Sequence, residues 1–501
     1  MVATTAVTAA LILLAGCGGD DKKSESGTDT GNNNQSTTSA TPSTPTAPSF
    51  DPPKAFAPAA AYPAIEEKGQ SSLDEAQMGI AGQVALVGNW AGLKGHDVAN
   101  PTNRWTVKSA EAETTQVYDA SKPMAVKVDG KDVAVVAYAQ GDKGNGTQKP
   151  AGLVVIHWVD VLTGKKIAEV SAKVSTMEGT GDNGGPNIKT QAFDPETGQV
   201  AIGVTTAGSV MTGTYQTVYA DPKTQKSTIV PGMNPAAVHG GVVAGAKGKQ
   251  EERAADGTVL LVDGASGKVT KQVPLKQAYL NPLGGGAQHA YFYGKKYTNY
   301  DAGTSTEAIF AVNLSTGAVT QTAPTVPQES DITTECFADQ ASAVVCMSKS
   351  IRSGPEELIG FDDATGKKVW GFSSKSASRV VPRVTAAFHG VVYAQTEAQP
   401  VLLDAKTGED LPSGSSSASP SSSDSPSSGD TPSSGDSPSD SNSPAGNESP
   451  GNGDMGLFDG KARSPEAVSP YGGVYKQLPT GTDYGSTVKV DSICIFLKPT
   501  A

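Results

Sequence analysis

Short apolar segments separated by turn residues recur from residue 55 to 412 and again from 455 to 501. Several are continuous runs of small residues, such as VALVG (84–88), AVVAYA (134–139), VVAGA (242–246) and VVYA (391–394). A half-exposed strand would alternate apolar and polar residues, so these runs predict strands that are covered on both faces. A parallel α/β sheet also gives continuous runs, but it requires helices of about ten or more residues between strands. The pattern shows no such amphipathic helix.

A turn of the form Asp/Asn-x-x-Thr/Ser-Gly follows many of these runs. It occurs at Asp160–Gly164, Asp194–Gly198, Asp263–Gly267, Asn313–Gly317, Asp362–Gly366 and Asp404–Gly408, with a degenerate copy at Asp221–Gln225. The Asp side chain can accept backbone N–H bonds within the turn, and Gly supplies a positive φ where the next strand begins. The repeating unit is therefore predicted to be strand, turn, strand.

A second class of hairpin alternates with the first, in eight segments such as MGIAGQVALVG and TAAFHGVVYAQT. From Asp221 onward, the Asp turns are 42, 50, 49 and 42 residues apart. Four-stranded blades of a β-propeller repeat at about 40–50 residues. We therefore expect an all-β propeller of four-stranded antiparallel blades, with eight blades favoured and seven as the alternative. The segments EAVSPYGGVYKQ and STVKVDSICIFLKP supply at least three strands of the last blade, and residues 55–75 supply its missing partner.

The turns also resemble the PQQ-like, or quinoprotein-dehydrogenase-like, propeller repeat, in which Asp-x-x-Thr-Gly is followed by a basic residue and a Trp. FDDATGKKVW (Phe361–Trp370) matches this repeat closely, and the other copies match as far as the Gly and the residue after it. The resemblance covers most of residues 60–411 and 455–501 and implies the propeller fold. One fold serves many functions, so the resemblance does not settle the activity.

Two polar segments are predicted to be disordered, because they cannot bury enough apolar surface to offset chain entropy. One is a tether over residues 17–54. The other is an insertion over 413–454, with 18 Ser, 6 Pro and six acidic residues, whose prolines recur every six residues. The insertion is expected to be either a spacer or a tolerated repeat expansion. It divides the propeller into a first part, 55–412, and closing strands, 455–501.

The segment before Cys17 is apolar and ends in Leu14-Ala15-Gly16. This resembles the lipobox of bacterial lipoproteins, which implies a signal peptide over residues 1–16, cleavage after Gly16, and lipidation (palmitate among the acyl chains) at Cys17. Two or three acyl chains anchor a protein stably to a membrane. No Lys or Arg precedes Cys17, whereas a signal peptide begins with a positive segment. Either the true start lies upstream, which we favour, or export is inefficient.

Three further cysteines follow. Cys336 and Cys346 lie on the two arms of ECFADQASAVVCM. Facing residues of a hairpin have Cα atoms about 4.5–5.5 Å apart, which is within disulfide reach, and an extracytoplasmic location favours oxidation. We therefore predict a Cys336–Cys346 disulfide. Cys494 is left over, and we expect it to be a small buried apolar residue.

The chain carries no recognisable catalytic, cofactor-binding or metal site. Quinoprotein dehydrogenases of the resembled family use a vicinal Cys pair, a Trp floor and Ca²⁺ ligands. This chain has no adjacent cysteines, and its four Trp show no repeated docking pattern. Its five His are far apart, and His239 and His389 precede Gly in equivalent turns.

The net charge of −12 offers no basic footprint for nucleic acid, and the insertion alone contributes half of it. We expect a monomeric, non-catalytic binding or scaffold protein of the bacterial envelope. It would be held on the extracytoplasmic face of the cell membrane by its lipid and would bind an envelope protein or a small ligand on one propeller face. The alternative is a quinoprotein-type oxidoreductase that uses PQQ and calcium.

Overall fold

The computed structural model describes residues 48–63, 76–100, 102–110, 116–142, 147, 151–175, 185–205, 215–251, 253–326, 332–376, 379–412, 457–477 and 492–501. The chain divides into two units, Met1–Thr44 and Pro45–Ala501. The first unit lies outside the described residues, and so do the predicted signal peptide, most of the predicted tether and the predicted insertion. All that follows concerns the second unit.

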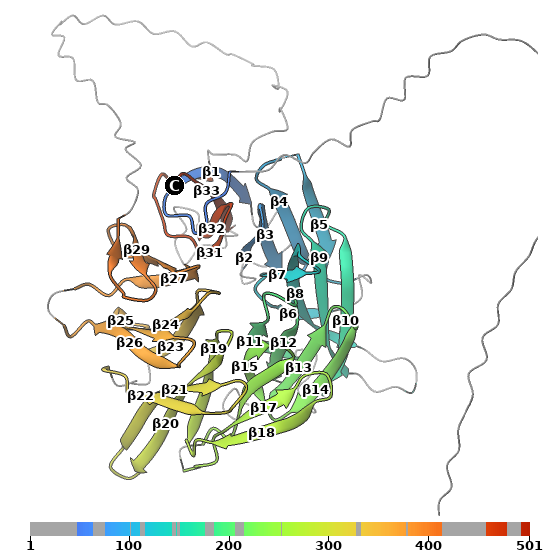
Figure 1. Cartoon of the computed structure of the whole chain (residues 1–501). Helices are drawn as coiled ribbons and strands as arrows, with labels where there is room; N and C mark the ends of the chain where they lie inside the picture. The colour runs from blue at the N-terminus through green and yellow to red at the C-terminus, as the bar shows by residue number, and fades with distance from the viewer. Residues whose placement is uncertain are drawn as a thin grey trace, which may run out of the picture. The chain divides into compact units, whose positions relative to one another are not determined.

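Eight antiparallel sheets form a ring of blades in the part of the chain that the structure describes, which confirms the propeller and decides for eight blades (Figure 1). The inner strands of blades 1 to 8 are β2 (Gln77–Ala81), β6 (Val117–Ala120) with β7 (Met124–Val128), β11 (Asn187–Phe193), β15 (Asn234–His239), β19 (Tyr279–Gly285), β23 (Ile332–Ala338), β27 (Arg383–Phe388) and β31 (Ala467–Ser469). Each inner strand contacts the inner strands of the neighbouring blades, and β31 contacts β2, which closes the ring. No helix of the described chain is long and apolar enough to cross a membrane.

The outer three strands of each blade follow in chain order. The second strands are β3 (Val84–Asn89), β8 (Lys131–Asp142), β12 (Val200–Thr205), β16 (Val242–Lys247), β20 (His289–Asn299), β24 (Ala343–Ser350), β28 (Val391–Gln395) and β32 (Gly472–Gln477). The third strands are β4 (Gly92–Asp97), β9 (Ala151–Asp160), β13 (Tyr215–Asp221), β17 (Thr258–Asp263), β21 (Thr304–Asn313), β25 (Gly354–Asp362), β29 (Pro400–Asp404) and β33 (Ile493–Pro499). The outermost strands are β5 (Arg104–Lys108), β10 (Lys166–Val174), β14 (Lys226–Pro231), β18 (Lys268–Pro274), β22 (Val319–Thr322), β26 (Lys367–Ser373), β30 (Asp410–Leu411) and, in blade 8, β1 (Phe56–Pro63).

The N-terminal strand closes blade 8. Figure 1 shows β1, in blue, beside β33, in red, and the two strands pair from Phe56↔Pro499 to Pro63↔Ile493. This confirms that residues 55–75 supply the strand missing from the last blade. The outermost strand of blade 8 thus comes from the N-terminal part of the chain and its other strands from the C-terminal part. Pairing between the two parts closes the ring.

The core consists of the interfaces between neighbouring blades. One cluster joins blades 2 and 3 through residues such as Trp158 and Ile202, and another joins blades 5 and 6 through Tyr291 and Phe361. The continuous small-residue runs are buried as expected, and every residue of β3 is buried. Because each strand lies between two neighbouring blades, both of its faces lose solvent, which removes the polar half of the usual strand pattern.

The ring has two faces with different connections. The turns between first and second strands, and between third and fourth strands, lie at one end, which we call the turn face. The connections between second and third strands, and those from one blade to the next, lie at the other end, which we call the loop face. Apart from residues 1–47 and residue 101, every stretch outside the described residues belongs to a connection at the loop face.

The predicted Asp turns form the third-to-fourth connection in blades 2 to 7. In each, the N–H of the fifth residue donates to the carbonyl of the first, at 2.8–2.9 Å, and the fifth residue has φ between 52° and 70°. Gln225 takes this conformation in the degenerate copy. The Asp194–Gly198 copy lies instead in the first-to-second connection of blade 3, where it joins β11 to β12, because the same hydrogen-bonded turn fits either hairpin of a blade.

Three tryptophans dock on these turns, which corrects the expectation that the four Trp share no docking pattern. Trp158 Nε1 of blade 2 donates to the Gly198 carbonyl of blade 3 at 2.8 Å. Trp105 and Trp370 each lie on an outermost strand, opposite Gly95 and Gly360 of the strand beside it. Trp105 Nε1 donates to the Val161 carbonyl at 2.7 Å and its ring covers Gly164 of blade 2; Trp370 Nε1 donates to the Ala405 carbonyl at 2.9 Å and its ring covers Gly408 of blade 7. A Cβ on any of the four glycines beside Trp105 and Trp370 would overlap the indole. The sequence did not reveal the pattern because each Trp docks on the following blade.

Candidate functional site

The inner strand of blade 2 is interrupted in its middle, between β6 and β7. Pro123 has no N–H to continue the ladder, and its ring packs against Gly79 and Gly88 of blade 1. Ser121 bridges the gap: its N–H donates to the Ala137 carbonyl at 2.8 Å, and its Oγ accepts from the Ala137 N–H at 2.9 Å. The interruption leaves Lys122 outside the ladder, at the inner edge of the blade.

Lys122 reaches across the axis of the ring. Its Nζ donates to the backbone carbonyl of Glu466 at 3.1 Å, and the carboxylates of Glu466 and Glu335 act on its charge. These three residues belong to blades 2, 8 and 6, none of which adjoins another, so their side chains approach one another at the axis. Burial lowers the pKa of the Lys122 ammonium, and the two carboxylates oppose that change.

A second pair of charges lies on the inner strands where blades 2 and 3 meet. Asp119 on β6 accepts the Ile188 N–H of blade 3 at 3.0 Å and the Ala120 N–H at 2.8 Å, with Lys189 nearby. Burial raises the pKa of the Asp119 carboxyl, while these two N–H groups and the Lys189 charge act against the rise. The inner strands of blades 2 and 3, with Glu335 and Glu466 of blades 6 and 8, thus carry charges of both signs. We take these charged groups, which we call the axial wall, as the candidate functional site.

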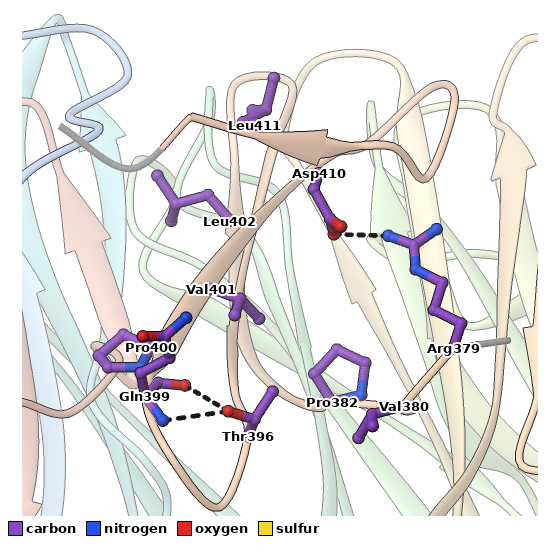
Figure 2. Close-up of a pocket in the computed structure, with 10 residues that line it drawn as sticks. All are labelled: Arg379, Val380, Pro382, Thr396, Gln399, Pro400, Val401, Leu402, Asp410 and Leu411. Carbon is purple, nitrogen blue, oxygen red and sulfur yellow. Dashed lines mark hydrogen bonds and ion pairs between the residues drawn. The ribbon is translucent and has the colours of Figure 1, made fainter. Parts of the chain in front are cut away.

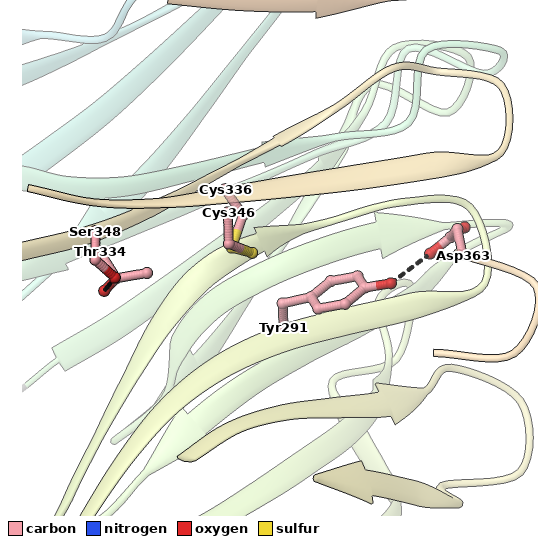
Figure 3. Close-up of a disulfide and its surroundings, with 6 residues drawn as sticks. All are labelled: Tyr291, Thr334, Cys336, Cys346, Ser348 and Asp363. Atoms are coloured by element: carbon pink, nitrogen blue, oxygen red, sulfur yellow. Dashed lines mark hydrogen bonds between the residues drawn. A yellow bond between two sulfur atoms is a disulfide. The ribbon is translucent and has the colours of Figure 1, made fainter. Parts of the chain in front are cut away.

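Other buried carboxylates join neighbouring blades. Asp363 of blade 6 accepts the Gln288 N–H at 2.9 Å and the His289 N–H at 3.3 Å, both from blade 5. It also accepts the Tyr291 hydroxyl of blade 5 at 3.4 Å (Figure 3). Burial raises the pKa of Asp363, and its hydrogen bonds and the His289 charge oppose the rise. Because Asp363 is surrounded by these blade 5 donors, its role is to join the blades.

The histidines singled out in the sequence occupy turns, as expected. His239 and His389 end the inner strands of blades 4 and 7. His239 lies 3.8 Å from the Asp194 carboxylate, and His389 pairs with Asp51. Within the described residues, no group of three or more His, Cys, Asp or Glu side chains is placed to hold a metal ion.

The predicted disulfide is confirmed. Cys336 on β23 and Cys346 on β24 face each other with their Cα atoms 4.0 Å apart and their sulfurs bonded (Figure 3). Two residues along the same pair of strands, the Thr334 and Ser348 hydroxyls lie 2.8 Å apart. Cys494 is buried as expected, and burial raises the pKa of its thiol to about 12. The predicted lipid site, Cys17, lies outside the described residues.

The described residues do not fit PQQ and calcium. The disulfide joins cysteines ten residues apart on two strands, so it cannot form a vicinal ring. Asp119 and Glu335 also have separate partners: Asp119 accepts backbone N–H groups, and Glu335 pairs with Lys349 at 2.7 Å. These carboxylates do not form a joint set of calcium ligands.

Sequence reasoning missed the axial charges. The three residues Lys122, Glu335 and Glu466 are separated by between 131 and 344 residues in the sequence, and nothing in their local sequence relates them. One local feature was available: Lys122-Pro123 stands directly before the run MAVKV, where a proline must interrupt an inner strand. That feature predicts that Lys122 lies outside the strand ladder, but it does not predict which residues Lys122 contacts.

No family model matches the chain, and no curated protein is similar to it in sequence. Among solved structures, the β-propeller domain of the Trilobed protease from Pyrococcus furiosus is 14% identical, with 60% of this chain and 84% of that chain covered and a TM-score of 0.34. Hydrazine synthase of Kuenenia stuttgartiensis is 12% identical (68% and 98% covered, TM-score 0.38). The Dos1 propeller is 9% identical (71% and 85% covered, TM-score 0.39). No inference about function follows from these likenesses.

Proposed function

We propose that this protein is a lipid-anchored binding propeller of the bacterial envelope, displayed on the extracytoplasmic face of the cell membrane. The observation that carries the proposal is the charged axial wall, where Lys122 Nζ donates to the Glu466 carbonyl at 3.1 Å and the Glu466 and Glu335 carboxylates act on its charge. Binding residues in general lie on loops that a rigid scaffold positions. A ring of eight blades is such a scaffold.

The chemistry of the wall suits recognition of a polar ligand. Lys122 supplies donors at the axis, and Glu335 and Glu466 supply acceptors near it. In the partly desolvated axis, each such charge discriminates strongly between partners that pair with it and partners that do not. The same residues carry no nucleophile–base pair, so the wall supports binding rather than turnover.

The N-terminal connection supports the proposed display. The Phe50 N–H donates to the Pro470 carbonyl at 2.8 Å, the Lys54 N–H donates to the Ala501 carbonyl at 2.7 Å, and the Tyr393 hydroxyl donates to the Pro53 carbonyl at 2.7 Å. These contacts lie at the turn-face end of blades 7 and 8. A tether that starts there leaves the loop face open. The predicted tether between Cys17 and Phe50 would reach roughly 30 Å.

The anchor is tested by Cys17→Ala in the full chain, with fractionation of intact cells. We expect the variant to leave the membrane fraction. Cys494→Ala is the matched control, because it removes a buried thiol and should leave the protein membrane-bound. Unchanged membrane association of Cys17→Ala would overturn the anchor.

The binding role is tested by native mass spectrometry of the protein released from its own membranes, alongside the variant Lys122→Met. We expect a bound species on the wild-type protein that is lost or reduced at least tenfold in the variant. Lys367→Met, on the outermost strand of blade 6, is the control, since it removes an exposed charge far from the axis. Equal occupancy in all three proteins would contradict a ligand site at the axis.

A further inference from the structure

Large apolar side chains that are exposed at the loop face gather in one sector. Over the described residues as a whole, nine large apolar side chains are exposed, and three of these nine lie at the loop face. Tyr300 is at the tip of the β20–β21 hairpin of blade 5, Ile351 is at the tip of the β24–β25 hairpin of blade 6, and Val380 lies between blades 6 and 7. Their exposed fractions are 42%, 81% and 72%. Single exposed apolar residues are ordinary, but three on adjoining connections require a reason.

Arginines gather in the same sector. The chain has only six, whereas lysine supplies the other 33 of its 39 basic residues (39 minus 6). Four of the six lie at the loop face between blades 4 and 7: Arg253, Arg352, Arg379 and Arg383. The Arg253 guanidinium lies 4.5 Å from the centre of the Tyr300 ring. Arginine, tyrosine and exposed aliphatic residues are the types that dominate the energetics of protein–protein interfaces.

A groove of about 370 Å³ lies beside Val380 (Figure 2). It forms because the outermost strand of blade 7, β30, has two residues and leaves the start of β29 uncovered. Apolar side chains, among them Val380, Val401 and Leu402, line it together with the polar side chains of Thr396 and Gln399. At its rim Arg379 pairs with Asp410 at 2.6 Å, and the Asp410 side chain is 76% exposed. An exposed rim pair contributes little to folding and is available for exchange with a partner's carboxylate.

Hydrogen bonds order the tip of the β20–β21 hairpin of blade 5. The Thr298 hydroxyl donates to the Thr304 carbonyl at 3.2 Å, and the Ala302 N–H donates to Asn299 Oδ1 at 3.2 Å. The buried part of the hairpin ends at Gly294 and Ala308, so the residues beyond it add nothing to the core. An ordered hairpin loses little entropy when it binds.

We propose that Tyr300, Ile351, Arg352, Arg379 and Val380, which we call the blade 5–7 patch, form a docking surface for an envelope protein with acidic and apolar side chains. Charge complementarity specifies the acidic groups, and the groove beside Val380 takes an apolar side chain. The proposal rests on the binding role above and adds where the partner docks. A polysaccharide is disfavoured, because the rings of Tyr297 and Tyr300 lie at 67° to each other and offer no flat platform for successive sugars.

The test places a photo-cross-linking amino acid at one position at a time in the full chain, on intact cells. The patch positions are Ile351 and Val380. The control positions are Leu162, which is 42% exposed in a turn-face connection, and Ile229, which is 36% exposed on the outermost strand of blade 3. We expect one protein to be captured from both patch positions and from neither control. Combining the Ile351 cross-linker with Arg352→Glu should reduce the yield at least tenfold, while Arg352→Lys should retain most of it.

Each other outcome overturns the docking surface. Capture at all four positions alike means contact without a site, capture of a glycan or a lipid contradicts the protein partner, and capture of a second copy of this chain makes the patch a self-interface. An unchanged yield with Arg352→Glu contradicts the charge complementarity. Failure at the patch together with a Lys122-dependent bound species would leave the proposed binding role standing and remove only the patch. Failure of both measurements removes the binding role as well.

Discussion

The turn face and the loop face of the ring are built from different kinds of connection. At the turn face, six blades use one five-residue turn, in which the first and last residues share a hydrogen bond and the last has positive φ. At the loop face, the connections that the structure describes differ in form: blade 1 turns directly between Asn89 and Gly92, whereas blade 5 extends a hairpin to Tyr300. The turn face repeats, and the loop face varies.

This difference assigns stability of the ring to the turn face and binding to the loop face. The turn glycines receive the docked indoles of Trp105 and Trp370, and Asp363 caps the turn of blade 5, so this face fastens each blade to the next. The loop face bears the exposed side chains of Tyr300, Ile351 and Val380 and most of the arginines. Substitutions should therefore change stability at the turn face and binding at the loop face.

The largest effect should come from Trp370→Ala, which removes the ring that covers Gly408 and the hydrogen bond to Ala405. Loss of a packed Trp destabilises a protein by about 3 kcal/mol or more. Val369→Ala, next to it and 51% exposed, is the control and should change stability by under about 0.5 kcal/mol. Urea denaturation measures both. Equal midpoints for the two variants would mean that the docked indole does not fasten the blades.

The next effect is a pair of opposite changes at one turn position. Gly366→Ala, at φ 66°, places a Cβ against His289 and should cost about 1–2 kcal/mol. Gln225→Gly, at φ 52° in the degenerate turn, should stabilise by about 0.5–1 kcal/mol because it relieves the same strain. Thermal unfolding gives the sign of each. A shift in the same direction for both would contradict the shared turn geometry.

A smaller effect concerns pH. The folded pKa of Asp363 is raised above its ordinary value of 3.8, so its contribution to stability is present below that pH and is lost as pH rises through the folded pKa. Asp363→Asn removes this dependence, so the variant should gain melting temperature relative to the wild-type protein as pH rises from about 3 to 7. Asp263, whose pKa the Ser266 hydroxyl and N–H lower, should behave oppositely in Asp263→Asn. Parallel pH profiles for both variants would refute the assignment.

The smallest effect is expected at the loop face. Ile351→Ser, at an 81% exposed position, should leave the urea midpoint unchanged within about 0.5 kcal/mol. Ile359→Ser in the same sheet, where the side chain is 1% exposed, is the destabilising control. A large loss of stability from Ile351→Ser would show that the loop face also holds the ring and would erase the contrast between the faces.

Much of the fold followed from local patterns. The Asp turns, the continuous small-residue strands, the eight blades and the Cys336–Cys346 bridge were all predicted, because each depends on residues close in sequence. The Trp docking and the Asp363 contacts were not predicted, because they join residues of different blades. The lipid site at Cys17, the tether over most of its length and the insertion stay predictions, as they lie outside the described residues.

The sequence by itself determined the repeating unit of this protein, which is the hairpin and its turn. The hydrogen bond and the positive φ of the turn depend only on the five residues that form it. Tertiary structure alone decided what the units make together. Closing the ring brings Lys122, Glu335 and Glu466 of three separate blades to one axis, and it sets Tyr300, Ile351 and Val380 in one sector. Those groupings depend on the rotation between blades, which arises from side-chain packing across every interface and has no local code.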